Sequence, residues 1–285
     1  MTDRDPHDDR PQLVALAYRI LGSVAEAEDA VQEAYLRLHR QTPGTIGNAG
    51  AWLTTVTARI CLDRLTSAQA RREHYVGEWL PEPITTQPDA VEQLELAESI
   101  SMAFLVVLET LTPAERVALL LHDVFGYDYA EIAVTLARSE TACRQLVSRA
   151  RKHLQARRPR FEHDPRLRAQ VAERFLAASA TGAVDGLLAL LAPDVSLHFD
   201  GGGKASAGLR PVHGPDRVVR YVQGVAKAAA QLHLTVRSLN GSPGLIAQRA
   251  DGRVDTAFVL DVAEGAVTRI NVIRNPDKLA HLALS

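Results

Sequence analysis

Cysteines and long apolar runs are scarce in this chain, and each scarcity excludes a class of protein. The two cysteines, Cys61 and Cys143, lie far apart and show no Cys-x-x-Cys or Cys/His ligand spacing, so a disulfide framework and a zinc site are not expected. No apolar run reaches the roughly 18 residues of a membrane helix, and the charged N-terminus lacks the apolar segment of a signal peptide. We expect a cytoplasmic protein with no membrane partner, cofactor or metal, in which only His198 and Asp200 merit testing as metal ligands.

A strong overall charge is also missing. The formal net charge is -2 and the sequence pI is about 6.6, so any nucleic-acid binding must come from a local basic patch. One such patch exists. Residues 138–160 contain eight Arg or Lys against one acid, Glu140, whereas a merely solvated helix face usually mixes the two signs.

The hydrophobic period divides the chain. Residues 11 to about 157 follow a helical period, and alternating strands mixed with helices follow from about 166. Prolines 81, 83 and 88 interrupt the helical half and favour extended backbone. The predicted domains are therefore two all-α modules at 1–75 and 93–157, joined by a Pro-rich linker at 76–92, and, after a linker at 158–165, an α+β domain at 166–285.

Capping signals locate the helices of the first half. Ser23 and Glu26 form the pattern of a capping box, and Thr112 with Glu115 and Asp128 with Glu131 repeat it. Ser139 opens a last helix only a short turn after the preceding one, which predicts a helix-turn-helix. In that last helix the apolar period predicts a buried face and leaves polar and basic side chains outward.

The motifs in this order resemble those of bacterial extracytoplasmic-function sigma factors, the small promoter-specificity subunits of RNA polymerase. "AEDAVQEAYLRLHR" resembles the family's polymerase-clamp helix, "AWLTTVTARICLDRL" its helix at the promoter minus-10 element, and the helix-turn-helix its minus-35 reader. "WLPEP", "DGGGK" and "NPDKL" resemble signatures of a subgroup with a fused C-terminal SnoaL-like domain, called sigma-J-like. The chain departs from the family at Ala137 and Arg138, where a glycine is common, and at Thr66 and Gln69, where arginine is common.

The resemblance implies a role for each motif in a subunit that binds the beta and beta-prime subunits of core RNA polymerase and promoter DNA. The implied polymerase-binding residues are Asp29, Glu33, Arg37 and Arg40. The implied minus-10 residues are Trp52, Arg59, Asp63, Arg71 and Arg72, together with the loop at 41–50. The implied minus-35 residues are Arg138, Thr141, Arg144, Gln145, Ser148, Arg149 and Lys152. The implied regulatory residues between domains are Trp79, Leu80, Pro81, Glu82, Pro83, Asp200, Gly201, Gly202, Gly203, Lys204, Asn275, Pro276, Asp277, Lys278 and Leu279.

The triple glycine before Lys204 could suggest a phosphate-binding loop, but Ala205 stands where a P-loop has Ser or Thr. We interpret the loop as structural. The C-terminal domain is expected to be a SnoaL-like cone with a curved, mostly antiparallel sheet that regulates the sigma domains in cis and could hold a small ligand.

Two alternatives stay open. One is a helix-turn-helix regulator with a ligand-binding domain, which would bind operator DNA tightly without polymerase. The other is an enzyme fused to a DNA-binding module, with His198, Asp200 or Asp255 as acid or base. Fold alone does not carry catalysis, and no paired constellation is forced by spacing, so we expect no enzyme.

Overall fold

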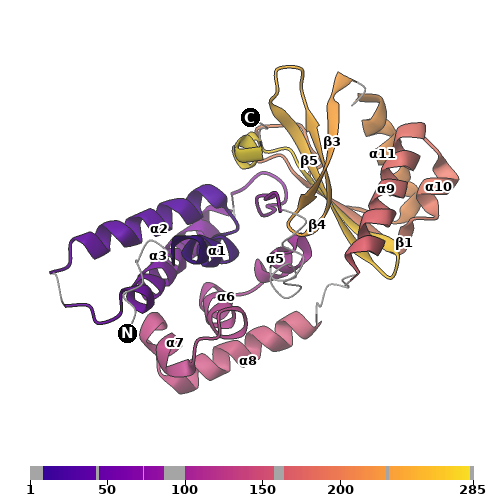
Figure 1. Cartoon of the computed structure of the whole chain (residues 1–285). Helices are drawn as coiled ribbons and strands as arrows, with labels where there is room; N and C mark the ends of the chain where they lie inside the picture. The colour runs from indigo at the N-terminus through magenta and orange to yellow at the C-terminus, as the bar shows by residue number, and fades with distance from the viewer. Residues whose placement is uncertain are drawn as a thin grey trace. The chain divides into compact units, whose positions relative to one another are not determined.

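The computed structural model describes residues 9–42, 45–72, 74–86, 100–156, 164–228 and 231–282. The chain divides into two compact units (Figure 1). Unit 1 combines Met1–His74 with Val107–Arg158, and unit 2 combines Tyr75–Val106 with Pro159–Ser285. The WLPEP segment thus packs with the C-terminal domain. The limits of the predicted domains stay a prediction.

Three helices form the first part of unit 1: α1 (Arg10–Leu21), α2 (Val24–His39) and α3 (Ala49–Arg72). Gly22 ends α1 with a left-handed φ of 71°, and the Ser23 side chain then accepts a hydrogen bond from the Glu26 amide to start α2. This short connection makes α1 and α2 neighbours. Fully buried side chains such as Leu16, Ile20 and Leu53 form their common core.

The second part of unit 1 contains α6 (Pro113–Leu119), a π-helical turn (Leu120–Val124), α7 (Tyr129–Leu136) and α8 (Glu140–Ala156). The two capping boxes predicted for this part of unit 1 both form, at Thr112 with Glu115 and at Asp128 with Glu131. The α7–α8 turn places Ala137 in the left-handed region with φ 51°, a conformation that glycine adopts at lower cost. The missing family glycine therefore falls at a position that needs a positive φ.

Unit 2 is an α+β domain. Its helices are α9 (Pro165–Thr181), α10 (Val184–Leu188) and α11 (Pro215–Ala228), and α5 (Met102–Leu108) begins in it. Its strands are β1 (Leu191–Asp200), β2 (Val212–His213), β3 (His233–Leu239), β4 (Ser242–Gln248), β5 (Val254–Ala263) and β6 (Ala266–Ile273), followed by 3-10 turns at Pro276–Lys278 and Ala280–Leu282.

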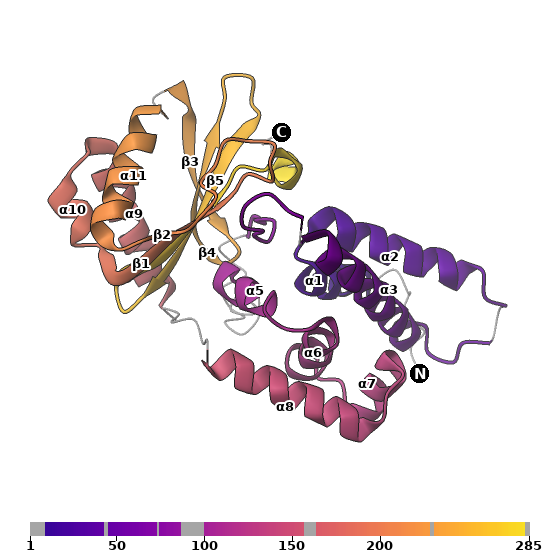
Figure 2. The same ribbon diagram turned by 180° about the vertical axis from the view of Figure 1, so that it is seen from behind.

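The six strands form one open, mixed sheet in the order β2-β1-β6-β5-β4-β3. Only β1 with β6 pairs in parallel among the described strands; the other pairs are antiparallel. Helices α9, α10 and α11 cover one face of the sheet, as the two opposite views show (Figures 1 and 2). Leu197 and Phe199 on β1 belong to the core under these helices.

The opposite face of the sheet carries the linker. Strand alternation turns Ser196, His198 and Asp200 to this face. Leu80 of the linker and Met102 of α5 join a second core there with Ile246, Val259 and Ile273 of the sheet and Leu279 of the C-terminal turns. One sheet thus separates two different surroundings, helices on one side and linker on the other.

The predicted fold class is confirmed: helical modules precede an α+β domain with a mostly antiparallel sheet. No sequence pattern predicted two short elements, the two-residue β2 and the π-helical turn.

Candidate functional site

The outer face of α8 is an exposed basic surface. Cys143, Leu146, Val147 and Ala150 are buried against the rest of unit 1, so the period of the helix turns its polar side chains outward. All seven residues predicted to read the minus-35 element are exposed: Arg138, Thr141, Arg144, Gln145, Ser148, Arg149 and Lys152. Their exposure and charge suit a helix that enters a major groove.

The basic side chains of α8 are held by neighbours from the same unit. Arg144 pairs with Glu140 at 2.9 Å and lies 5.0 Å from the ring centre of Tyr129. Arg151 contacts Asp123 of the π-helical turn at 2.5 Å, and this hydrogen bond raises the pKa of Arg151 above its ordinary value. Both guanidinium groups have partners within unit 1, yet both side chains remain exposed.

In the predicted minus-10 helix, α3, the Arg59 side chain forms hydrogen bonds with another helix of unit 1, α7. The Arg59 guanidinium donates to the carbonyl oxygens of Thr135 at 3.0 Å and Val134 at 2.6 Å. Both carbonyls lie at the C-terminal end of α7, where a cation is favoured. Trp52 is half-buried and Asp63 exposed, whereas the side chains of Arg71 and Arg72 lie outside the described residues.

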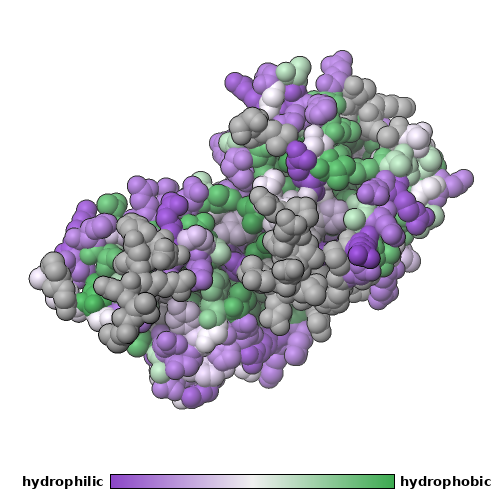
Figure 3. Space-filling view, viewed as in Figure 1, coloured by the Kyte–Doolittle hydropathy of each residue, from purple (hydrophilic) through white to green (hydrophobic). Residues whose placement is uncertain are grey.

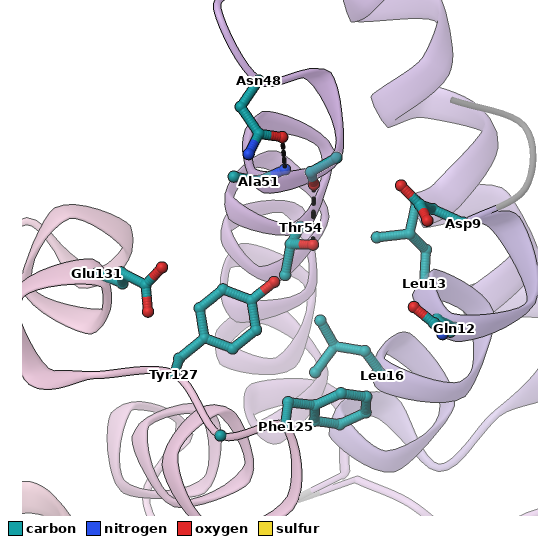
Figure 4. Close-up of a pocket in the computed structure, with 12 residues that line it drawn as sticks. Asp9, Gln12, Leu13, Leu16, Asn48, Ala51, Thr54, Phe125, Tyr127 and Glu131 are labelled. Atoms are coloured by element: carbon teal, nitrogen blue, oxygen red, sulfur yellow. Dashed lines mark hydrogen bonds between the residues drawn. The ribbon is translucent and has the colours of Figure 1, made fainter. Parts of the chain in front are cut away.

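A pocket of about 460 Å³ opens beside the start of α3 (Figure 4). The Asn48 side chain caps α3 by accepting from the Ala51 amide at 3.0 Å. The ring of Tyr127, from the loop before α7, points toward Thr54 across this pocket. Residues 43 and 44 of the predicted base-capture loop lie outside the described part of the chain.

The predicted polymerase-binding stripe on α2 is partly paired. Glu33 contacts Arg37 at 2.6 Å and Arg64 of α3 at 3.1 Å. Although its partial burial opposes the shift, these two guanidinium groups lower the pKa of Glu33. Asp29 and Arg40 are exposed, as is Arg37.

A buried polar cluster ties the linker to the sheet, and we call it the linker clamp: Tyr75, Leu80, Asp200, Asn275 and Lys278. Asp200, fully buried, accepts from the Tyr75 hydroxyl at 2.6 Å, the Leu80 amide at 2.8 Å and Lys278 at 2.6 Å. Lys278 also donates to the Leu80 carbonyl, and Asn275 donates to the Tyr75 hydroxyl at 2.8 Å. WLPEP, DGGGK and NPDKL thus each contribute a residue.

Aromatic rings of the linker enclose the cation of the clamp. The Lys278 ammonium lies 3.9 Å from a ring centre of Trp79 and 5.3 Å from that of Tyr75. Cation–π contacts of this kind strengthen when water is excluded. Burial, followed by the hydrogen bond to Asp200, raises the pKa of Tyr75 well above its ordinary value, so its hydroxyl stays protonated as a donor.

A second polar group lies beside the clamp. His198 contacts Glu78 of the linker at 2.8 Å and Ser196 at 3.0 Å. Burial opposes ionisation of Glu78, yet His198 and Arg269 bring its pKa below the ordinary value. Burial lowers the pKa of His198.

Three family models match the chain: Sigma-70 region 2 over residues 7–71, Sigma-70, region 4 over residues 101–154, and a SnoaL-like domain over residues 172–273. The ECF RNA polymerase sigma factor SigJ of Mycobacterium tuberculosis (strain ATCC 25618 / H37Rv) is 44% identical, covering 94% of this chain and 90% of that protein. The chain belongs to the ECF sigma factor family.

Two further relatives agree. The probable ECF RNA polymerase sigma factor SigI of the same strain is 34% identical, over 95% of this chain and 92% of that protein. The crystal structure of Mycobacterium tuberculosis SigJ is similar with a TM-score of 0.76 and 40% identity, over 95% of each chain. The similarity to SigJ therefore extends through the SnoaL-like domain of this sigma factor.

The glycine loop of this sigma factor is built for packing. A Cβ on Gly202 would collide with the Asn275 side chain and lie 2.9 Å from the Tyr75 hydroxyl, and the φ of Gly202 is 58°. Lys204 is exposed and pairs with Asp277 at 2.5 Å. The remaining linker residues, Pro81, Glu82 and Pro83, are buried.

The acid and base candidates do not form one site. Asp200 belongs to the clamp and His198 contacts Glu78, while Asp255 pairs with Arg249 at 2.5 Å and Arg274 at 2.9 Å. None of the three lines the cavity under the helices of unit 2. Among the described residues no cluster of three or more His, Cys, Asp or Glu could hold a metal ion, and no helix is long and apolar enough to cross a membrane.

Sequence reasoning missed Tyr75, Glu78 and Arg269. Tyr75 and Glu78 directly precede WLPEP, so an extension of that motif by four residues would have included them. Arg269 gives no such signal, because its partners Glu78 and Asn271 are assembled by the sheet.

Proposed function

We propose that this sigma factor binds core RNA polymerase and directs it to promoters, with its C-terminal domain regulating the outcome in cis. The exposed basic face of α8 carries the proposal. In a helix-turn-helix, the N-terminal residues of the second helix reach base edges in the major groove. Arg144 and Gln145 are placed to read bases, while Arg149 and Lys152 are placed to contact phosphates.

The other surfaces of unit 1 take the remaining roles. The α2 stripe around Asp29 and Arg37 docks on the beta and beta-prime subunits, where charge complementarity sets partner choice. Trp52, Arg59 and the pocket beside α3 capture unstacked bases of the minus-10 element. Because Arg59 caps α7 in this structure, its hydrogen bonds to Val134 and Thr135 must break before Arg59 can contact DNA.

The linker clamp supports regulation in cis. The clamp fixes residues 75–86, which connect the two DNA-binding modules, onto the sheet of the C-terminal domain. A tethered partner acts at a high effective concentration, so the domain replaces a separate regulatory protein at modest affinity. A small ligand in the cone would provide the signal, and the whole assembly would act in the cytoplasm with the polymerase.

Run-off transcription with purified core polymerase tests this function. Full-length protein is compared with Trp79→Ala and Lys278→Met, and with Arg253→Met as the control at an exposed ion pair. We expect promoter-specific initiation whose amount changes in the two clamp variants and not in the control. Equal output from all four proteins would remove the regulatory role. Tight duplex binding without any initiation would favour a helix-turn-helix repressor instead.

A further inference from the structure

The helix-covered face of the sheet in unit 2 holds a cavity of about 460 Å³. Its walls come from α9 and α11, and its floor from β1 and β3 to β6. Phe175, Tyr221, Leu245, Phe258 and Leu260 are among the side chains that line it. The linker and the clamp lie on the opposite face, so the cavity is distinct from every surface described above.

The lining carries no formal charge. No Asp, Glu, Lys, Arg or His occurs among the described residues that line the cavity, and its side-chain hydroxyls are those of Ser179 and Tyr221. Ser179 already donates to the Phe175 carbonyl at 2.7 Å, which leaves its lone pairs as acceptors. An ion entering this cavity would lose its hydration without meeting an opposite charge, at a cost of several kcal/mol.

The mouth of the cavity lies at the sheet edge. Leu234 and Val236 on the edge strand β3 line the cavity while remaining 47% and 52% exposed. Figure 3 shows apolar residues at the surface of unit 2 in the region where β3 lies next to α11. An apolar molecule approaching from solvent would meet these two side chains first.

The size of the cavity decides between a small molecule and a protein segment. One turn of an α-helix about 10 Å wide and 5.4 Å long already occupies roughly 420 Å³. A docked helix would therefore extend beyond the cavity after one turn. Pockets for small ligands commonly span about 300–1,000 Å³, which includes the volume found here.

We propose that this cavity binds an uncharged, mainly apolar small molecule, one or two rings in size with at most one or two hydrogen-bonding groups, that enters beside β3. This inference deepens the proposed regulatory role of the C-terminal domain. Leu197, Leu260 and Ile270 line the cavity and immediately precede His198, Asp261 and Asn271, which face the linker side. A ligand on one face thus rests on the strands that carry the linker on the other.

The test is a fluorescence titration of the full-length protein with N-phenyl-1-naphthylamine, an uncharged apolar probe, followed by displacement with 1-naphthol or 1-naphthoate. We expect saturable one-site binding, with naphthol displacing the probe at a concentration at least about tenfold lower than naphthoate. Leu234→Arg at the mouth and Ser179→Phe inside should each weaken probe binding at least about tenfold. Val184→Arg, at an exposed apolar residue outside the cavity, is the matched control and should bind as the parent does.

Two results would each overturn one part of the proposal, either the location of the site or the uncharged nature of the ligand. Absence of saturable probe binding, or binding that survives both cavity variants, would exclude the cavity as the site. Displacement by naphthoate as effective as that by naphthol would exclude an uncharged ligand. Circular dichroism of each variant establishes that it is folded. Run-off transcription by the same variants without probe reports on regulation separately, so a failure of ligand binding and a failure of regulation in cis are distinguishable.

Discussion

The Lys278 ammonium lies 2.6 Å from the Asp200 carboxylate, and both side chains are buried. Asp200 ends β1, and Lys278 lies in the turn that follows β6. Because β1 and β6 pair in parallel, both strands end at the same edge of the sheet. The linker residue Leu80 bonds to both members of this ion pair through its own amide and carbonyl. The pair therefore needs the linker to satisfy its remaining hydrogen-bonding groups.

Breaking this pair should release the linker. Lys278→Met or Asp200→Asn leaves an unpaired buried group, and such losses cost about 3–5 kcal/mol. The chain contains two tryptophans, so Trp52→Phe leaves Trp79 as the reporter. In that background, each single variant should shift Trp79 emission to the red and lower the melting temperature of unit 2.

The double variant Asp200→Asn with Lys278→Met measures the coupling energy between the two side chains. It should lose clearly less stability than the sum of the two single variants, because no lone charge remains buried. Additive losses together with unchanged Trp79 emission would mean that the pair does not hold the linker.

The pH dependence of unit 2 should contain a contribution from Asp261. Burial raises the pKa of this carboxyl from 3.8 to about 6. Because the pKa is raised in the folded state, the contribution of Asp261 to folding stability comes from its protonated form. It is fully present below pH 4 and is lost as pH rises to 6. Asp261→Asn should therefore be more stable than the parent above pH 6, by up to about 3 kcal/mol, and similar to it near pH 4.

Melting curves of Asp261→Asn and its parent between pH 4.5 and 8 check this prediction. Taking the difference between the two proteins cancels the contributions of Glu78 and His198, whose lowered pKa values act in the opposite direction. Asp251→Asn, at an exposed loop carboxylate, is the control. A difference in melting temperature that does not vary with pH would contradict the assignment.

Two substitutions on α8 should distinguish residues that recognise bases from residues that bind the phosphate backbone. Arg144→Ala should lower the preference for the cognate minus-35 sequence, since a bidentate base contact supplies about 1–3 kcal/mol of discrimination. Lys152→Ala should weaken binding to all sequences and reduce the salt dependence. Competition binding with cognate and scrambled duplexes at two salt concentrations measures both. Unchanged promoter choice by Arg144→Ala would show that Arg144 does not read bases.

The turn before α8 offers a stability test. Ala137 has φ 51°, and a left-handed conformation costs a residue with a side chain about 1–2 kcal/mol. Ala137→Gly should therefore raise the stability of unit 1 by a fraction of that amount, because glycine also gains freedom in the unfolded chain. Chemical denaturation measures the change. A loss of stability would show that the Ala137 side chain makes compensating contacts.

Local features of this chain were predictable from sequence, and distant pairings were not. The capping boxes at Thr112 and Asp128 join residues three positions apart, so the motif contains both partners. Glu78 and His198 meet across a sequence separation of 120, and Arg59 reaches Thr135 across 76. Such partners depend on strand order and helix packing, which no local pattern encodes. The signature motifs marked the clamp, but only the fold shows which atoms pair.

Run-off transcription by the full chain and by a truncation ending near residue 160 tests whether the chain initiates at promoters under the control of its own C-terminal domain. Both proteins are assayed with purified core polymerase on a panel of promoter fragments. We expect promoter-specific initiation by the full chain and a changed amount of transcript from the truncation, because the C-terminal domain no longer holds the linker. No initiation by the full chain on any promoter, together with tight binding to duplex DNA by the protein alone, would contradict it.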